Sequence, residues 1–144
     1  MAKYNKEYYE PLEQMMAVRH QYMSKILRDH TDQDIYNFFQ NKQVLDLGCG
    51  TGEFLNNYFE MGAQCTGIDI EKNFKLKNKK NFNLYNLDAN TFLKNCKKKF
   101  DIIFLFEFLE HLEEGDKHKL FESLIKKLNK NCLLYTSDAA DDTC

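Results

Sequence analysis

Three glycines at every second position follow a short apolar stretch, in the sequence VLDLGCGTG from Val44 to Gly52. Glycine permits positive φ angles and lets a ligand approach the backbone, and a helix starting near Glu53 would present free N–H groups to that ligand. Asp69 lies 21 residues after Gly48, where a carboxylate at the end of a second strand can accept two hydrogen bonds from a ribose diol. This combination predicts a site for an adenosine-containing cofactor.

The spacing of the glycines argues against a dinucleotide. The dinucleotide fingerprint is G-x-G-x-x-G, whereas here the third glycine comes one residue early and Glu53 takes its place. A carboxylate at the helix start would repel a pyrophosphate but would tolerate a ligand whose end carries an ammonium group. Asp46, within the predicted first strand, would also repel a phosphate. An NAD-linked oxidoreductase is therefore disfavoured.

Strands and helices alternate through the part of the chain that carries these residues. Hydrophobic periodicity predicts strands at residues 43–48, 64–70, 82–88 and 100–108, helices at 53–62, 89–96 and 116–130, and a polar connector with one or two helical turns at 71–80. Two helices, at 12–29 and 31–39, precede them, and Thr31 or Asp32 caps the second. The alternation predicts an α/β fold: a Rossmann-like doubly wound, mostly parallel sheet, ending after four to five strands, the fifth at Cys132–Thr136.

Four motifs in this order resemble the class I S-adenosylmethionine-dependent methyltransferases: VLDLGCGTG, GIDI, NLDA and FDIIFLFEFLEHL, over about residues 40–130. The resemblance implies S-adenosyl-L-methionine as the cofactor. It also implies roles for individual residues: the methionine end at Asp46, Gly48, Gly50 and Gly52, the ribose at Asp69, the adenine edge at Asp88 and the backbone of Ala89, and the sulfonium and substrate mouth at Phe106 and Glu107. Cys49 and Ile70, within the same motifs, are assigned to the cofactor site as well.

Three of these residues have simpler interpretations. Asp88 could be the N-cap of the helix that follows it, and Asp69 could be a surface turn residue. Cys49 is more typical of a small packing residue than of a nucleophile.

The segment EFLEHL adds Glu107, Glu110 and His111 at the exit of the fourth strand. Methyl transfer needs a base only when the acceptor must lose a proton, and His111 with Glu107 are the predicted catalytic residues. The same E-x-x-E-H arrangement resembles metal-dependent RNA 2′-O-methyltransferases, since two carboxylates and an imidazole could bind a divalent metal. It is also widespread in ubiquinone-pathway O-methyltransferases without metal, where it shapes the pocket. We therefore predict no metal.

Composition limits the other possibilities. A chain of 144 residues fits one domain, and a net charge of −2 argues against undirected attraction to nucleic acid. The lysines at 72–80 and 97–99 are interpreted as solvated faces. The five cysteines form no C-x-x-C pair, which together with the absence of an apolar signal segment or membrane span predicts a cytoplasmic protein.

The expected organisation has three parts. Residues 1–40 are an N-terminal helical segment that covers the substrate, 41–131 are an incomplete cofactor-binding core, and 132–144 are an artefactual tail, because CLLYTSDAADD resembles a translated sequencing adapter. The expected function is methyl transfer to an oxygen of a small molecule. The alternatives are a metal-dependent RNA 2′-O-methyltransferase and a truncated fragment that binds cofactor without turnover. The oligomeric state is not predicted.

Overall fold

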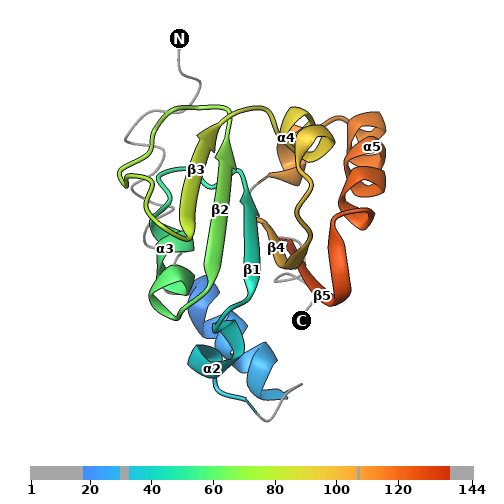
Figure 1. Cartoon of the computed structure of the whole chain (residues 1–144). Helices are drawn as coiled ribbons and strands as arrows, with labels where there is room; N and C mark the ends of the chain where they lie inside the picture. The colour runs from blue at the N-terminus through green and yellow to red at the C-terminus, as the bar shows by residue number, and fades with distance from the viewer. Residues whose placement is uncertain (1–17, 30–32, 107, 137–144) are drawn as a thin grey trace.

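A computed structural model describes residues 18–29, 33–106 and 108–136, which contain a five-stranded parallel sheet (Figure 1). The strands are β1 (Gln43–Leu47), β2 (Gln64–Asp69), β3 (Phe82–Asn86), β4 (Phe100–Leu105) and β5 (Leu128–Thr136), in the order β3-β2-β1-β4-β5. Every neighbouring pair is parallel. The predicted doubly wound α/β class is confirmed.

Helices cover both faces of this sheet (Figure 1). They are α2 (Ile35–Phe39), α3 (Glu53–Glu60), α4 (Ala89–Asn95) and α5 (Glu114–Ile125), with a 3₁₀ turn at Leu109–His111 and a helical stretch at residues 18–29. Residues 18–29, α2 and α3 share one hydrophobic core with the sheet, whereas α4 and α5 share a second core on the opposite face. Burial on both faces explains why β4 is continuously apolar from Ile102 to Leu105.

Several boundaries differ from the sequence predictions. Asp34 caps α2, because its carboxylate accepts a hydrogen bond from the Asn37 N–H at 3.0 Å, and the predicted caps Thr31 and Asp32 lie outside the described residues. The connector 71–80 contains no helix. Helix α5 ends at Ile125 rather than at residue 130, since the Lys127 N–H bonds to the Leu124 carbonyl and β5 starts at Leu128.

Other sequence predictions concern the two ends of the chain. Residues 12–17 of the predicted first helix and the last eight residues lie outside the described part. Within the described part, β5 contains the expected fifth strand, and Leu133 and Leu134 pair with Ile102 and Ile103 of β4. The foreign origin of residues 132–144 stays a prediction. No helix in the described ranges is long and apolar enough to span a bilayer, and the four cysteines described are free thiols.

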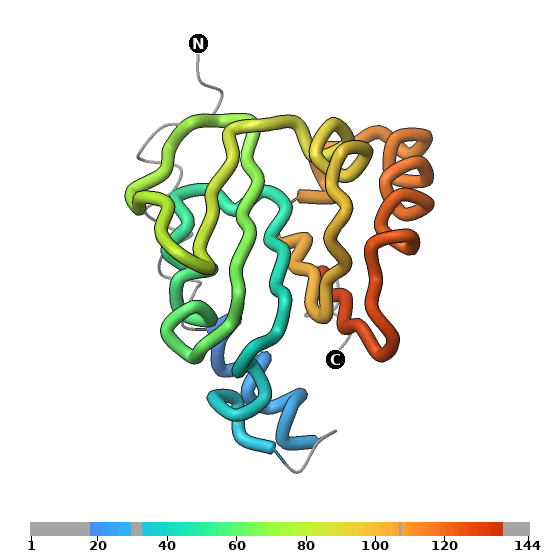
Figure 2. Tube along the Cα trace, in the orientation of Figure 1, coloured from blue at the N-terminus to red at the C-terminus, as the bar shows by residue number. Residues whose placement is uncertain are grey.

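The topology gathers the predicted motifs at one edge of the sheet. From β1 the chain adds β2 and β3 on one side of the sheet and then β4 and β5 on the other side, so the strand order reverses between β1 and β4. Ligands of open α/β sheets bind at the carboxyl ends of the strands beside such a reversal. The loops after β1, β2 and β3 lie together at this carboxyl edge, while the turns leading into β1, β4 and β5 lie at the opposite, amino edge (Figure 2).

Candidate functional site

The glycine loop after β1 is held in shape by its neighbours in β2. Gly48, Gly50 and Gly52 have φ angles of +79°, +56° and +85°, a region that glycine adopts without steric cost. The N–H groups of Gly48 and Cys49 both donate to the Ile68 carbonyl, at 2.8 and 3.1 Å. The loop is therefore anchored to the end of β2 before it reaches the start of α3.

Glycine is required here by packing as well as by backbone angle. A Cβ added to Gly52 would lie 2.8 Å from a methyl carbon of Leu84, and one added to Gly48 would lie 3.0 Å from the ring of Phe108. A larger residue at either position would displace the loop from β3 or from the segment after β4.

Cys49 points into the protein rather than toward a ligand. Its thiol packs against Gly67, where an added Cβ would lie 2.8 Å from the sulfur. Burial raises the pKa of the Cys49 thiol well above its ordinary value, so the thiolate is disfavoured. The structure thus supports the packing interpretation of this side chain.

Asp69 ties the loop to the strand that precedes it. One carboxylate oxygen accepts from the Gly50 N–H at 2.8 Å, and the other accepts from the Glu71 N–H at 2.8 Å. Burial raises the pKa of Asp69, and these two hydrogen bonds oppose that rise. Because each carboxylate oxygen has a second lone pair, the side chain can still accept hydrogen bonds from a diol.

Apolar side chains are exposed beside Asp69. Ile70 is 70% exposed and Leu87 is 37% exposed, and the Leu87 N–H donates to the Asp69 carbonyl at 3.0 Å, which brings the ends of β2 and β3 together. Large exposed apolar residues at a strand edge suit a planar ring. Sequence reasoning selected Ile70 but missed Leu87, whose signal was its place directly before Asp88.

Asp88 is the N-cap of α4. Its Oδ1 atom accepts from the Thr91 N–H at 2.9 Å and from the Thr91 hydroxyl at 3.2 Å. This contact confirms the capping interpretation. In the part of the chain that the structure describes, no hydrogen bond reaches the second oxygen, Oδ2, so capping does not exclude a ligand contact. Ala89, which is buried, begins the helix itself, and its N–H is one of the groups that a helix leaves unsatisfied.

Asp46 is the most perturbed acid of the site. It is 3% exposed, and burial raises its pKa to about 7, while the Arg19 guanidinium lowers the pKa and the Asp69 carboxylate raises it further. Arg19 comes from the helical stretch 18–29, and its guanidinium carbon lies 4.9 Å from the centre of the Phe106 ring. An N-terminal cation thus reaches the carboxyl edge, a long-range contact that no local pattern encodes.

The E-x-x-E-H segment is only partly described. Glu107 lies outside the described residues, and Glu110 and His111 are exposed on the 3₁₀ turn. Among the residues that the structure describes, no group of three or more histidine, cysteine, aspartate or glutamate side chains is arranged to hold a metal. The catalytic roles of Glu107 and His111 stay predictions.

Glu53, used above to disfavour a pyrophosphate, has a cationic neighbour. Its carboxylate lies 3.1 Å from the Lys75 ammonium and accepts from the Thr51 hydroxyl at 3.0 Å. The Lys75 N–H also donates to the Thr51 carbonyl at 3.1 Å. The connector 71–80 therefore crosses the glycine loop and compensates part of the charge at the helix start.

Comparisons with known proteins agree on one family. The family described as "Methyltransferase domain" matches residues 18–143. The chain is 29% identical to the ubiquinone biosynthesis O-methyltransferase of Pelagibacter ubique over 134 residues, which cover 88% of this chain and 55% of that protein. It is 33% identical to the protein of the same name from Glaesserella parasuis, covering 72% of this chain and 48% of that protein.

A solved structure agrees with this result. A SAM-dependent methyltransferase from Archaeoglobus fulgidus superposes with a TM-score of 0.59 at 29% identity, covering 85% of this chain and 54% of that chain. The chain thus spans about half the length of the relatives it matches.

Proposed function

Because the chain belongs to the class I S-adenosylmethionine-dependent methyltransferases, we propose that it catalyses methyl transfer from S-adenosylmethionine to an oxygen atom of a small molecule. The oxygen acceptor is supported by the two O-methyltransferases reported above. The observation that carries the proposal is the carboxyl edge, where the anchored glycine loop, the Asp69 carboxylate and the exposed Ile70 lie together.

The residues at this edge fit the cofactor. Ile70 and Leu87 would contact the adenine ring, and Asp69 would accept hydrogen bonds from the ribose hydroxyls. Asp88 Oδ2 and the Ala89 N–H would meet the adenine edge. The glycine backbone and the Asp46 carboxylate would hold the methionine end, whose ammonium group favours a nearby negative charge. When bound, the cofactor supplies a methyl group on a sulfonium that is already an activated leaving group.

The protein's remaining work is to orient the acceptor and move one proton. The Arg19 guanidinium lies 4.9 Å from the centre of the Phe106 ring and lowers the pKa of Asp46. The two side chains would therefore border the methionine end, shape the acceptor mouth and exclude water. An acceptor hydroxyl must lose its proton as the new bond forms. We assign that proton to His111, with Glu107 as the second predicted catalytic residue, because both follow β4 in the sequence.

The test is methyl transfer from radiolabelled S-adenosylmethionine to a panel of simple phenols and catechols. We expect a methyl ether as product, and His111→Ala should lower the rate by about 10²–10⁴-fold if the imidazole is the base. His118→Ala, an exposed histidine on α5, is the matched control and should retain the rate. Transfer to amines alone, or an unchanged rate in His111→Ala, would contradict the assignment.

No observation on the described residues favours the metal-dependent RNA alternative. Activity that a chelator abolishes and Mg²⁺ restores would support it. Cofactor binding without turnover on any acceptor would support the remaining alternative, a fragment that only binds cofactor.

A further inference from the structure

Exposed lysines gather at the amino edge of the sheet, where the chain enters β4 and β5. They belong to the end of α4, the turn into β4, the turn into β5 and the start of β5 itself. All are exposed, and we call them the lysine cluster: Lys94, Lys97, Lys98, Lys99, Lys126 and Lys130. The sequence showed only the run 97–99. The fold adds three more lysines to that run.

Three contacts show that the two turns form one surface. The Lys127 ammonium donates to the Cys96 carbonyl, and the Phe100 N–H donates to the Lys127 carbonyl at 2.8 Å. The Asn129 side-chain amide donates to Asp101 at 2.8 Å. The lysines of the two segments therefore share one surface.

Acidic groups near the cluster offset only part of its charge, because two acids, Asp101 and Glu122, lie near six exposed lysines. Asp101 lies between the two turns, where the Gln43 N–H and the Asn129 side-chain amide donate to its oxygens. Glu122 on α5 lies one helical turn before Lys126. The turns 96–99 and 126–127 themselves contain no acidic residue.

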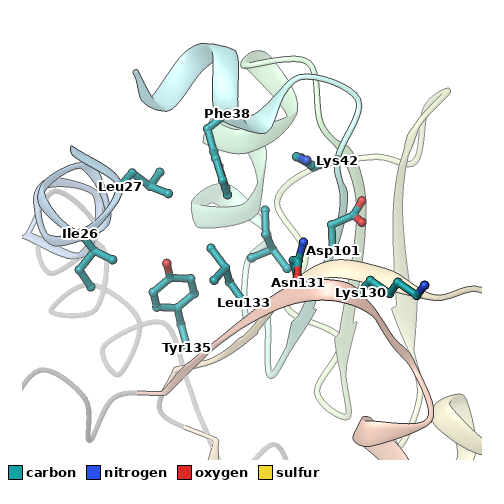
Figure 3. Close-up of a pocket in the computed structure, with 10 residues that line it drawn as sticks. Ile26, Leu27, Phe38, Lys42, Asp101, Lys130, Asn131, Leu133 and Tyr135 are labelled. Atoms are coloured by element: carbon teal, nitrogen blue, oxygen red, sulfur yellow. The ribbon is translucent and has the colours of Figure 1, made fainter. Parts of the chain in front are cut away.

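The cluster also has apolar neighbours. Ile125, next to Lys126, is 67% exposed. A cavity of about 380 Å³ lies between the helical stretch 18–29, α2 and β5. Its polar end carries Lys42, Asp101 and Lys130, while Ile26 and Leu27 line its apolar end (Figure 3). Lysines beside exposed aliphatic surface suit lipid head groups and acyl chains. Neither turn holds an exposed aromatic residue on which nucleic-acid bases could stack.

We propose that the lysine cluster docks the protein on the surface of an anionic lipid bilayer, with Ile125 entering the interface. Clusters of four to eight basic residues attract anionic lipids with about 1 kcal/mol per residue, or roughly fivefold in partition. The acids Asp46, Asp69 and Asp88 lie at the opposite edge of the sheet, so the docked protein keeps its cofactor edge open to water. This inference does not depend on which acceptor is methylated.

The experiment is sedimentation of the whole chain with vesicles. One set contains phosphatidylcholine alone, and the other contains equal parts of phosphatidylcholine and phosphatidylglycerol. We expect binding to the second set only, weakening as salt rises toward about 0.15 M. The double variant Lys98→Gln/Lys126→Gln should lower the vesicle partition coefficient about 25-fold, because each lysine contributes about fivefold. Lys72→Gln/Lys77→Gln makes the same charge change at exposed lysines outside the cluster and should bind within about twofold of the wild type.

Two further arms separate lipid from other partners. Ile125→Ser should weaken vesicle binding by severalfold, because the interface would lose an aliphatic side chain. A single-stranded RNA should compete poorly. Equal losses in the two double variants, binding to neutral vesicles, or RNA binding that depends on Lys98 and Lys126 in the absence of vesicle binding would overturn the proposal.

Discussion

Replacing Asp46 with asparagine should stabilise the cofactor-free protein at neutral and alkaline pH. The pKa of Asp46 is raised from its ordinary 3.8 to about 7, mainly by burial. Because the folded pKa lies above the unfolded one, the folded state binds more protons in this range, and stability falls as pH rises from about 4 to about 7. A shift of about three pKa units corresponds to about 4 kcal/mol.

The assay is urea unfolding of the cofactor-free protein at about pH 5 and about pH 8. Between these values the wild type should lose about 3 kcal/mol through Asp46 alone, since roughly two of the three pKa units lie in this window. Asp46→Asn should lose much less and should be the more stable protein at the higher pH. Glu122→Gln, at an exposed acid on α5, should keep the wild-type slope.

A smaller slope should remain in Asp46→Asn, because the pKa of Asp69 is also raised by burial. The reasoning is refuted if Asp46→Asn is no more stable than the wild type at about pH 8 and follows the same pH dependence.

Three other substitutions test separate parts of the account. Arg19→Gln removes the cation that lowers the pKa of Asp46, so the loss of stability measured by urea unfolding should extend to higher pH than in the wild type. Arg19→Lys keeps a cation and should lose stability over the wild-type pH range. Gly52→Ala should cost about 1–3 kcal/mol in thermal unfolding, because φ is +85° and the new Cβ would lie 2.8 Å from Leu84; an unchanged melting temperature would contradict this. Ile70→Ala should leave stability nearly unchanged, since the side chain is 70% exposed, yet weaken S-adenosylhomocysteine binding by up to about tenfold in calorimetry.

Hydrophobic periodicity was sufficient to place the four strands from β1 to β4 and the helices between them, because each of those segments buries a regular set of apolar residues. It failed where backbone contacts decide the boundary. Helix α5 continues as an apolar pattern through Leu128, but the hydrogen bond from the Lys127 N–H to Leu124 and the pairing of Leu128 with Phe100 turn the chain into β5.

The candidate site shows the same division. The glycine loop and Asp69 are local motifs that fold onto one edge, so the sequence could select them. Two other contacts join segments that are distant in the sequence: the ion pair between Lys75 and Glu53, and the contact between Arg19 and Phe106. No spacing pattern along the chain predicts them. Leu87 was missed because an apolar residue at a strand end is usually buried, whereas here it is partly exposed.

The central claim is that the carboxyl edge binds S-adenosylmethionine, and calorimetric titration with S-adenosylhomocysteine beside NAD tests it most directly. We predict saturable binding of S-adenosylhomocysteine that is lost in Asp69→Ala, and no binding of NAD. Binding of NAD without binding of S-adenosylhomocysteine would contradict the account.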